Sequence, residues 1–194
     1  QPAAVKTLFA RTAVLTRLVN HPGTLKIAKD AIYCPDDHQH RMITSGDYHS
    51  DLSDNEPNDD VTAKILRDFE WAKPEIDDPS VMDLRNSGKM MVALRLIELA
   101  KMSGEKVLLF SRSICTLDYI GAALEHYNIR YWRIDGTVQS AKRQTMIESF
   151  VADSVEDVFL LSSLAGSLGV NLTAASRVIL FDVGWNPCHD EQAI

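Results

Sequence analysis

Residues 162–182 read SSLAGSLGVNLTAASRVILFD, and the rest of the chain can be organised around this stretch. It places a polar, glycine-punctuated loop, residues 163–171, between the apolar runs 158–161 and 178–181. Short apolar runs of this kind are typical of strands buried on both faces of a parallel sheet. Loops at the carboxyl ends of such strands bind ligands in α/β proteins. The stretch therefore predicts two buried strands and a first candidate for a binding loop.

The alternation of strands and helices extends upstream of this stretch. We expect strands at 107–110, 131–134, 158–161 and 177–181, with helices at 113–127 and 140–150. Strands that alternate with helices predict an α/β fold with a parallel sheet and right-handed crossovers. Four loops then gather at one edge of the sheet, at residues 111–112, 135–137, 163–171 and 182–187.

The first part of the chain is predicted to be helical. Residues 3–20 place Leu8, Leu15, Leu18 and Val19 on roughly one helical face. The following His-Pro-Gly at 21–23 ends this helix, because proline disfavours the helical conformation in the residue before it. His21 itself is expected to be a capping or core histidine rather than a catalytic base.

The sequence NSGK at residues 86–89 opens another predicted helix. Its apolar positions recur at helical spacing and are Met90, Ala93, Leu94 and Ile97. A Gly-Lys pair also occurs in P-loops, but that motif needs glycine at position 83 and Ser or Thr at position 90. Asp83 and Met90 stand there, which excludes a phosphate-binding loop of that type.

The net charge of −7 is concentrated in one segment. Residues 36–60 carry eight acidic side chains against Arg41 alone, so the rest of the chain is electrically balanced. Acidic, polar segments with few aliphatic residues gain little from burial, and 34–60 is therefore predicted to be a mobile insert. The overall acidity does not exclude a nucleic-acid partner for the remainder, although no strongly basic patch stands out.

Composition also bounds the class of protein. No apolar run is long enough to cross a bilayer, and residues 1–20 lack the apolar core of a signal peptide, so we expect a soluble, intracellular protein. Cys34, Cys115 and Cys188 lie too far apart for the paired spacing of a zinc site.

Several motifs in one order resemble a known family. The series comprises VLLFSRS at 107–113, RIDG at 133–136, SSLAGSLGVNL at 162–172 followed by RVILFD, and WNPCHDEQAI at 185–194. It resembles motifs IV, IVa, V and Va of the second RecA-type lobe in the Swi/Snf family of helicase-like, superfamily 2 DNA translocases. LTRLVNHPGTL at 15–25 and NSGKM at 86–90 are similar to two further family segments, and AGSLGVNL together with the acidic insert resembles the ATRX branch.

The resemblance implies a division of the chain into four parts. Residues 1–33 would be a helical segment joining two motor lobes, 34–60 the acidic insert, 61–84 a short helix and linker, and 85–194 a C-terminal RecA-like lobe. The last part would stop before motif VI and its catalytic arginines, and the first lobe with its Walker motifs and Mg²⁺ site would lie elsewhere. The 194-residue chain alone is therefore expected not to hydrolyse ATP, and it contains no expected catalytic residue.

The resemblance also implies contacts and partners. The intact parent would be an ATP-dependent translocase on double-stranded DNA, a nuclear chromatin remodeller that uses ATP and Mg²⁺ and is not bound to a membrane. Gly169 and Asn171 match positions near the nucleotide. The positions that match contacts to the DNA backbone are Ser111, Arg112, Ser163, Leu164, Trp185 and Asn186. Such contacts would give affinity with little sequence specificity.

Alternatives remain open for these residues and for the whole chain. Gly166 and Gly169 could have no role beyond shaping a tight turn. Trp185 could be a partly buried anchor, and Arg112 a solvated side chain. Arg133 and Asp135 could form a surface ion pair. The alternative functions are another superfamily 2 helicase lobe, acting on RNA for example, and a non-catalytic α/β module that binds nucleic acid or protein.

Overall fold

The computed structural model describes residues 11–12, 14–33, 73–152, 158–162, 172 and 174–183, and it divides the chain into two compact units. Unit 1 comprises residues 1–46 and 51–90, and unit 2 comprises 47–50 and 91–194. The predicted insert at 34–60, the predicted helix at 61–71 and the loop 163–171 lie outside the described residues. Within the described part, no helix is both long enough and apolar enough to cross a membrane.

The described part of unit 2 contains a parallel sheet with the strand order β2-β3-β1-β4. The strands are β1 (Val107–Ser111), β2 (Tyr131–Ile134), β3 (Val158–Ser162) and β4 (Arg177–Leu180). All three strand pairs are parallel, and the register places Phe110 beside Leu161 on one side and beside Leu180 on the other. The central strands β1 and β3 are buried along their whole length, as their continuous apolar sequences predict.

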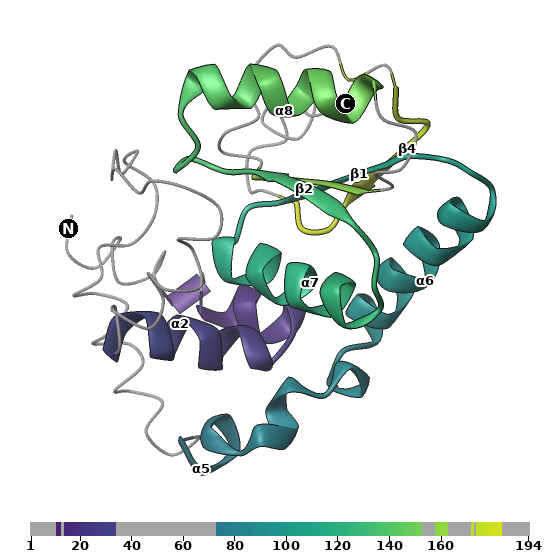
Figure 1. Cartoon of the computed structure of the whole chain (residues 1–194). Helices are drawn as coiled ribbons and strands as arrows, with labels where there is room; N and C mark the ends of the chain where they lie inside the picture. Colours follow the sequence, from purple (N-terminus) through teal and green to yellow (C-terminus); the bar gives the residue numbers. More distant parts are fainter. Residues whose placement is uncertain are drawn as a thin grey trace. The chain divides into compact units, whose positions relative to one another are not determined.

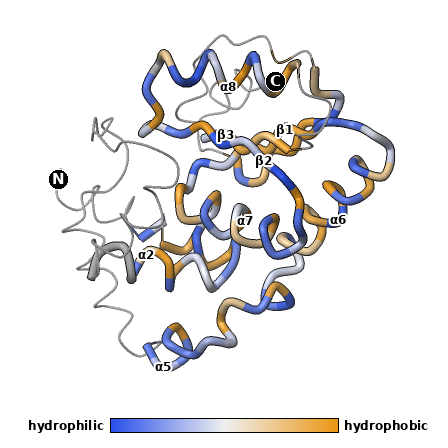
Figure 2. The backbone as a smooth tube through the Cα atoms, viewed as in Figure 1, coloured by the Kyte–Doolittle hydropathy of each residue, from blue (hydrophilic) through white to orange (hydrophobic). Residues whose placement is uncertain are grey.

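Two helices cover opposite faces of this sheet (Figure 1). They are α7 (Ile114–His126) and α8 (Ser140–Ala152). On the α8 face, Phe150 stacks on Phe159 with ring centroids 4.9 Å apart. The buried cluster around this pair consists of Leu108, Phe110, Ile134, Ile147, Phe150, Phe159 and Leu161. Figure 2 shows the hydrophobic colouring concentrated on β1 and β3, where both faces are covered.

Local sequence determines where these helices begin and end. The Ser113 side chain accepts a hydrogen bond from the Thr116 amide and so caps α7. Helix α6 (Gly88–Met102) begins after Ser87, whose Oγ accepts a hydrogen bond from the Met90 amide. Gly104 follows α6 with a φ of +68°, a conformation that glycine adopts without the steric cost of a Cβ atom.

Unit 1 is built from short helices. Residues 11–12 and 14–20 are helical, and the helix is interrupted at His21 and Pro22 before α2 (Gly23–Tyr33) begins. The other elements are α5 (Lys73–Asp77) and the two 3-10 turns η3 (Pro79–Met82) and η4 (Leu84–Asn86). The predicted end of the first helix at residues 21–23 is therefore confirmed, and a second helix follows directly.

The apolar side chains that share one face of the first helix do not form its buried side. Leu15, Leu18 and Val19 are exposed, whereas Val14 and Asn20 are buried. Asn20 and the following His21 form hydrogen bonds to residues 83–89, which hold this polar side of the helix inward. A buried hydrogen-bond network thus outweighs the apolar periodicity that the sequence displays.

Candidate nucleic-acid interface at the carboxyl edge of the sheet

The carboxyl ends of the strands lie together, as the predicted topology requires. Ser111 at the end of β1 is in register with Ser162 at the end of β3. The amide of Phe181, which follows β4, donates a hydrogen bond to the Phe110 carbonyl at 2.9 Å. Ser111, Ser162 and Asp182 are all buried, so this edge carries polar side chains that are withdrawn from solvent.

Asp182 connects the end of β4 to the turn between β1 and α7. Its Oδ2 accepts a hydrogen bond from Ser111 Oγ at 2.7 Å, and its Oδ1 accepts one from the Arg112 amide at 2.6 Å. Ser111 Oγ in turn accepts the Ser113 amide at 3.2 Å. Because Ser113 caps α7, this chain of hydrogen bonds runs from the Asp182 carboxylate to the first turn of that helix.

Arg112 differs from its neighbours at this edge. Its backbone amide is bonded to Asp182, but its side chain is partly exposed. Among the described residues, its guanidinium has no hydrogen-bond or ion-pair partner. A cation that is held through its own backbone and left without a carboxylate partner is available for an anionic ligand such as a phosphate.

A second polar cluster follows β2. Arg133 forms ion pairs with Asp118 on α7 and with Asp135, the latter at 2.9 Å. Burial lowers the pKa of Arg133, but the two carboxylates outweigh this effect and hold that pKa above its ordinary value. The Arg133–Asp135 pair that the sequence suggested is therefore present, although both side chains are largely buried rather than at the surface.

The loop after β2 is held from two sides. Asp135 Oδ1 accepts the Thr137 amide at 3.0 Å, which closes a turn over residues 135–137. Arg143 on α8 donates hydrogen bonds to the backbone carbonyls of Asp135, Gly136 and Val138. The shape of this loop therefore depends on one helix and on its own aspartate.

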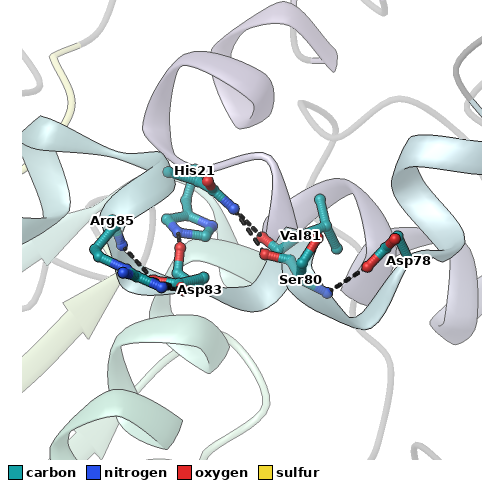
Figure 3. A network of polar contacts seen from close by, with 7 residues as sticks. His21, Asp78, Ser80, Val81, Asp83 and Arg85 are labelled. Carbon is teal, nitrogen blue, oxygen red and sulfur yellow. Dashed lines mark hydrogen bonds and ion pairs between the residues drawn. The ribbon is translucent and has the colours of Figure 1, made fainter.

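In unit 1, the Asn-His-Pro segment contacts the residues that lead into α6. His21 is fully buried; its Nδ1 accepts the Gly23 amide at 2.9 Å, and its Nε2 lies 3.0 Å from the Asp83 carbonyl oxygen. These two partners fix the neutral tautomer with the proton on Nε2. Figure 3 shows the ring between the helical segment and Asp83, whose carboxylate also binds Arg85.

Asn20 completes this polar junction, which we define as Asn20, His21, Asp83, Ser87 and Lys89. The Asn20 carbonyl accepts a hydrogen bond from Ser87 Oγ at 2.6 Å, and its Oδ1 accepts one from Lys89 Nζ at 2.7 Å. The lysine of the Gly-Lys pair thus binds a neighbouring side chain of unit 1. His21 is both a cap and a core histidine, as the sequence analysis expected.

The structure describes two of the predicted contact residues, Ser111 and Arg112, and places them side by side at the sheet edge. Ser163, Leu164, Gly169, Asn171, Trp185 and Asn186 lie outside the described residues. Their contacts with DNA or nucleotide stay predictions. The described residues contain no group of three or more His, Cys, Asp or Glu side chains that could hold a metal ion.

Sequence reasoning missed two residues that shape this edge. Asp182 carried a signal, because it is a carboxylate directly after an apolar strand, at a position where side chains from neighbouring strands meet. Nothing in the sequence singles out Arg143, because it is one of several cations on a predicted helix and its partners in the loop are backbone carbonyls.

Comparison with known proteins agrees with this geometry. The family model described as "Helicase conserved C-terminal domain" matches residues 88–194. Helicase ARIP4 of Xenopus tropicalis is 39% identical over 146 residues, and the match covers 65% of this chain and 10% of that protein. Transcriptional regulator ATRX of Homo sapiens is 35% identical over 149 residues, covering 64% of this chain and 6% of that protein.

Two solved structures are also similar. The C-terminal part of the Fun30 ATPase domain has a TM-score of 0.55 at 26% identity and covers 88% of this chain and 54% of its own. The SWI2/SNF2 ATPase C-terminal domain of Sulfolobus solfataricus has a TM-score of 0.50 at 25% identity, covering 86% of this chain and 70% of its own.

The chain belongs to the helicase conserved C-terminal domain family, and within it to the Swi/Snf (Snf2) family. Its fold is the RecA-like C-terminal lobe of these ATPases. The chain spans about a tenth or less of the length of the curated relatives reported above.

Proposed function

We propose that this chain supplies the second motor lobe of an ATP-dependent double-stranded DNA translocase that acts on chromatin in the nucleus. In this role it binds the DNA backbone at the carboxyl edge of its sheet and contributes part of the ATP site. The observation that carries the proposal is Arg112, a partly exposed cation without a described partner at the edge where a ligand meets a parallel sheet.

The chemistry of the edge suits a motor rather than a sequence-specific binder. Phosphates are bound by cations, hydroxyls and backbone amides, none of which distinguishes bases. Such contacts can be released and formed again at each step along a duplex. Trp185, Asn186, Ser163 and Leu164 are proposed to extend this track, on the strength of the motifs that they belong to.

The nucleotide half of the proposal involves the predicted loop. Gly169 and Asn171 are proposed to lie near ATP, with the asparagine contacting the ribose. Binding of ATP between the two lobes would close them, and they would reopen after hydrolysis; Mg²⁺ is proposed to bind on the first lobe of the intact parent. The first lobe is then the intramolecular partner of this chain.

Binding of a short DNA duplex to the 194-residue chain tests the DNA half of the proposal. Fluorescence anisotropy should give similar affinities for unrelated sequences, and the affinity should fall as salt rises because counterions are released from phosphates. Arg112→Ala should weaken binding, whereas Arg177→Ala at the amino end of β4 should not, although both variants remove one positive charge. Equal effects of the two variants would contradict a contact surface at the carboxyl edge.

The ATPase half needs two measurements. The chain alone should release no phosphate above background with DNA and Mg²⁺ present, because half of the proposed ATP site is supplied by another lobe. The intact parent should hydrolyse ATP in a DNA-stimulated manner, and duplex RNA should stimulate it less. Stimulation by RNA that equals stimulation by DNA would favour an RNA helicase, and a parent without turnover would favour the non-catalytic module.

A further inference from the structure

We infer that Asp182 is a positioning residue for DNA binding: its carboxylate fixes the turn at residues 111–113 so that the Arg112 guanidinium meets the phosphate backbone. The inference rests on the proposed function of the sheet edge and names the group that organises it. Asp182 itself is buried and makes no direct contact with DNA in this proposal.

The hydrogen bonds determine what the carboxylate can do. Both of its oxygens are engaged by groups of the turn, Oδ1 by the Arg112 amide and Oδ2 by Ser111 Oγ. A hydrogen bond to a carboxylate is stronger than one between neutral groups, and two such bonds from adjacent residues restrict the turn more than one. The position of Arg112 relative to β4 is therefore set through its backbone.

The same geometry explains why Arg112 is not neutralised by its neighbour. An arginine next to a buried aspartate usually forms an ion pair with it through the guanidinium. Here the hydrogen bond from Arg112 to Asp182 comes from the backbone amide, and the side chain stays partly exposed. The carboxylate thus orders the backbone and leaves the positive charge of the side chain for a ligand.

The turn also leads into α7. Ser111 Oγ accepts the Ser113 amide, and Ser113 caps the helix, so Asp182, the turn and the first residues of α7 form one hydrogen-bonded unit within unit 2. The amino end of a helix favours anions, and Arg112 lies directly before the capping residue. Displacement of the turn would therefore move the Arg112 guanidinium away from the amino end of α7, where the helix stabilises a bound phosphate.

A matched pair of variants separates positioning from charge. Asp182→Asn and Asp182→Ala remove the same carboxylate, so any direct repulsion of DNA is lost equally in both. Asparagine still offers an oxygen to the Arg112 amide and an NH₂ group to Ser111 Oγ, whereas alanine offers nothing. A difference between the two variants then measures hydrogen bonding in the turn.

The affinity of the chain for a short DNA duplex should be measured as a function of salt. Arg112→Ala should reduce the slope of log K against log salt by about one unit, as for loss of one phosphate contact. Asp182→Ala should reproduce this change and weaken binding roughly three- to tenfold, the range of a lost hydrogen bond. Asp182→Asn should stay close to wild type, and the double variant Arg112→Ala/Asp182→Ala should bind like Arg112→Ala alone.

The outcomes separate the inference from the proposed function. If Arg112→Ala weakens binding but a folded Asp182→Ala chain binds as well as wild type or better, the inference fails and the sheet edge remains the proposed DNA surface. If wild type does not bind the duplex, the proposed function fails and the inference fails with it. Circular dichroism of each variant establishes that it is folded.

One measurement covers the case in which Asp182→Ala does not fold. Hydrogen exchange of the Arg112 amide, followed by NMR in wild type and in Asp182→Asn, reports the bond to residue 182 directly. The amide should be protected in both chains and shifted downfield in wild type by its short bond to the carboxylate. Fast exchange of this amide in wild type would overturn the inference.

Discussion

Two buried polar clusters fix the backbone of this chain, the polar junction around His21 in unit 1 and the Asp182 cluster in unit 2. In the junction, both ring nitrogens of His21 meet backbone groups, and Asn20 is engaged through its carbonyl and its side chain. In the Asp182 cluster, the carboxylate is equally engaged, but the adjacent Arg112 side chain is partly exposed and has no partner among the described residues.

This difference between the two clusters distinguishes residues that stabilise the fold from residues that bind a ligand. A residue whose polar atoms are all bonded within its own unit contributes to folding, and its loss should appear as a loss of stability. A residue that is held through its backbone while its charge stays available should affect binding before it affects stability. The following substitutions test whether the two clusters divide in this way.

His21→Ala should have the largest effect on stability. The substitution leaves the Gly23 amide and the Asp83 carbonyl without their buried partner and creates a cavity the size of an imidazole ring. Unsatisfied buried groups cost about 1–3 kcal/mol each, so we expect a loss of roughly 2–4 kcal/mol in the free energy of unfolding. Urea denaturation measures it, with the exposed His126→Ala as the control. A loss no larger than that of the control would mean that the junction does not stabilise the fold.

Gly121→Ala should have the next largest effect and should act within unit 2. A Cβ atom at this position of α7 would lie 2.7 Å from the Tyr131 hydroxyl oxygen, so the Tyr131 ring would have to shift and its hydrogen bond to Glu125 would be disturbed. Overpacking of this kind costs about 1–3 kcal/mol, and the thermal midpoint should fall accordingly.

Two companion variants make this prediction specific. Gly136→Ala adds the same methyl group where nothing lies within 4 Å, and should be nearly neutral. Tyr131→Phe removes the clashing oxygen and should recover part of the loss in the Gly121→Ala background. If the double variant is as unstable as the sum of the single ones, the clash is not the cause.

The sheet was predictable because each strand carries its own signal. The apolar runs at 107–110 and 158–161 need burial on both faces, and the helices between them carry apolar residues at helical spacing. The strands and helices of unit 2 therefore lie within two residues of the expected bounds. Leu117, Ile120 and Leu124 recur at helical spacing on α7 and are buried, because one helical face must cover the sheet.

The polar contacts were less predictable because their partners are distant in sequence. The hydrogen bond between Ser111 and Asp182 joins residues 71 positions apart, and that between Asn20 and Ser87 joins residues 67 apart. Periodicity describes only neighbours on one element, which is why the apolar face of the first helix does not reveal its buried side. It also could not distinguish the buried Ser111 hydroxyl, which is bonded to Asp182, from the exposed contact that its motif suggested.

Ser87→Ala should have a smaller effect than the two substitutions above. Its hydroxyl caps α6 through the Met90 amide and donates to the Asn20 carbonyl, so one side chain serves the helix and the junction together. Loss of a capping serine typically costs about 1 kcal/mol, and we expect a loss near that value in urea denaturation. Ser103→Ala on the exposed turn after α6 is the control. An equal effect of both substitutions would mean that neither the cap on α6 nor the contact with Asn20 stabilises the fold.

The smallest expected effect is a pH dependence of stability that arises from His21 in the polar junction. Burial lowers the pKa of His21 below its ordinary value of 6.5, and the hydrogen bond and charge of Asp83 offset this only in part. The unfolded chain therefore binds a proton at a higher pH than the folded chain does. Stability from this residue is fully present above pH 6.5 and declines as the pH falls below it, until the folded ring is protonated as well.

The cause is the Nδ1 atom, which cannot accept the Gly23 amide once it carries a proton. The carboxyl group of Asp83, with its pKa lowered to about 2, titrates far below this window and does not obscure it. The free energy of unfolding should therefore fall between pH 7 and pH 5 in wild type by more than in His21→Ala. DNA binding through Arg112 should not follow the same titration, because a guanidinium keeps its charge throughout this pH range. A pH dependence that persists unchanged in His21→Ala would assign it to another group and remove this distinction between the two clusters.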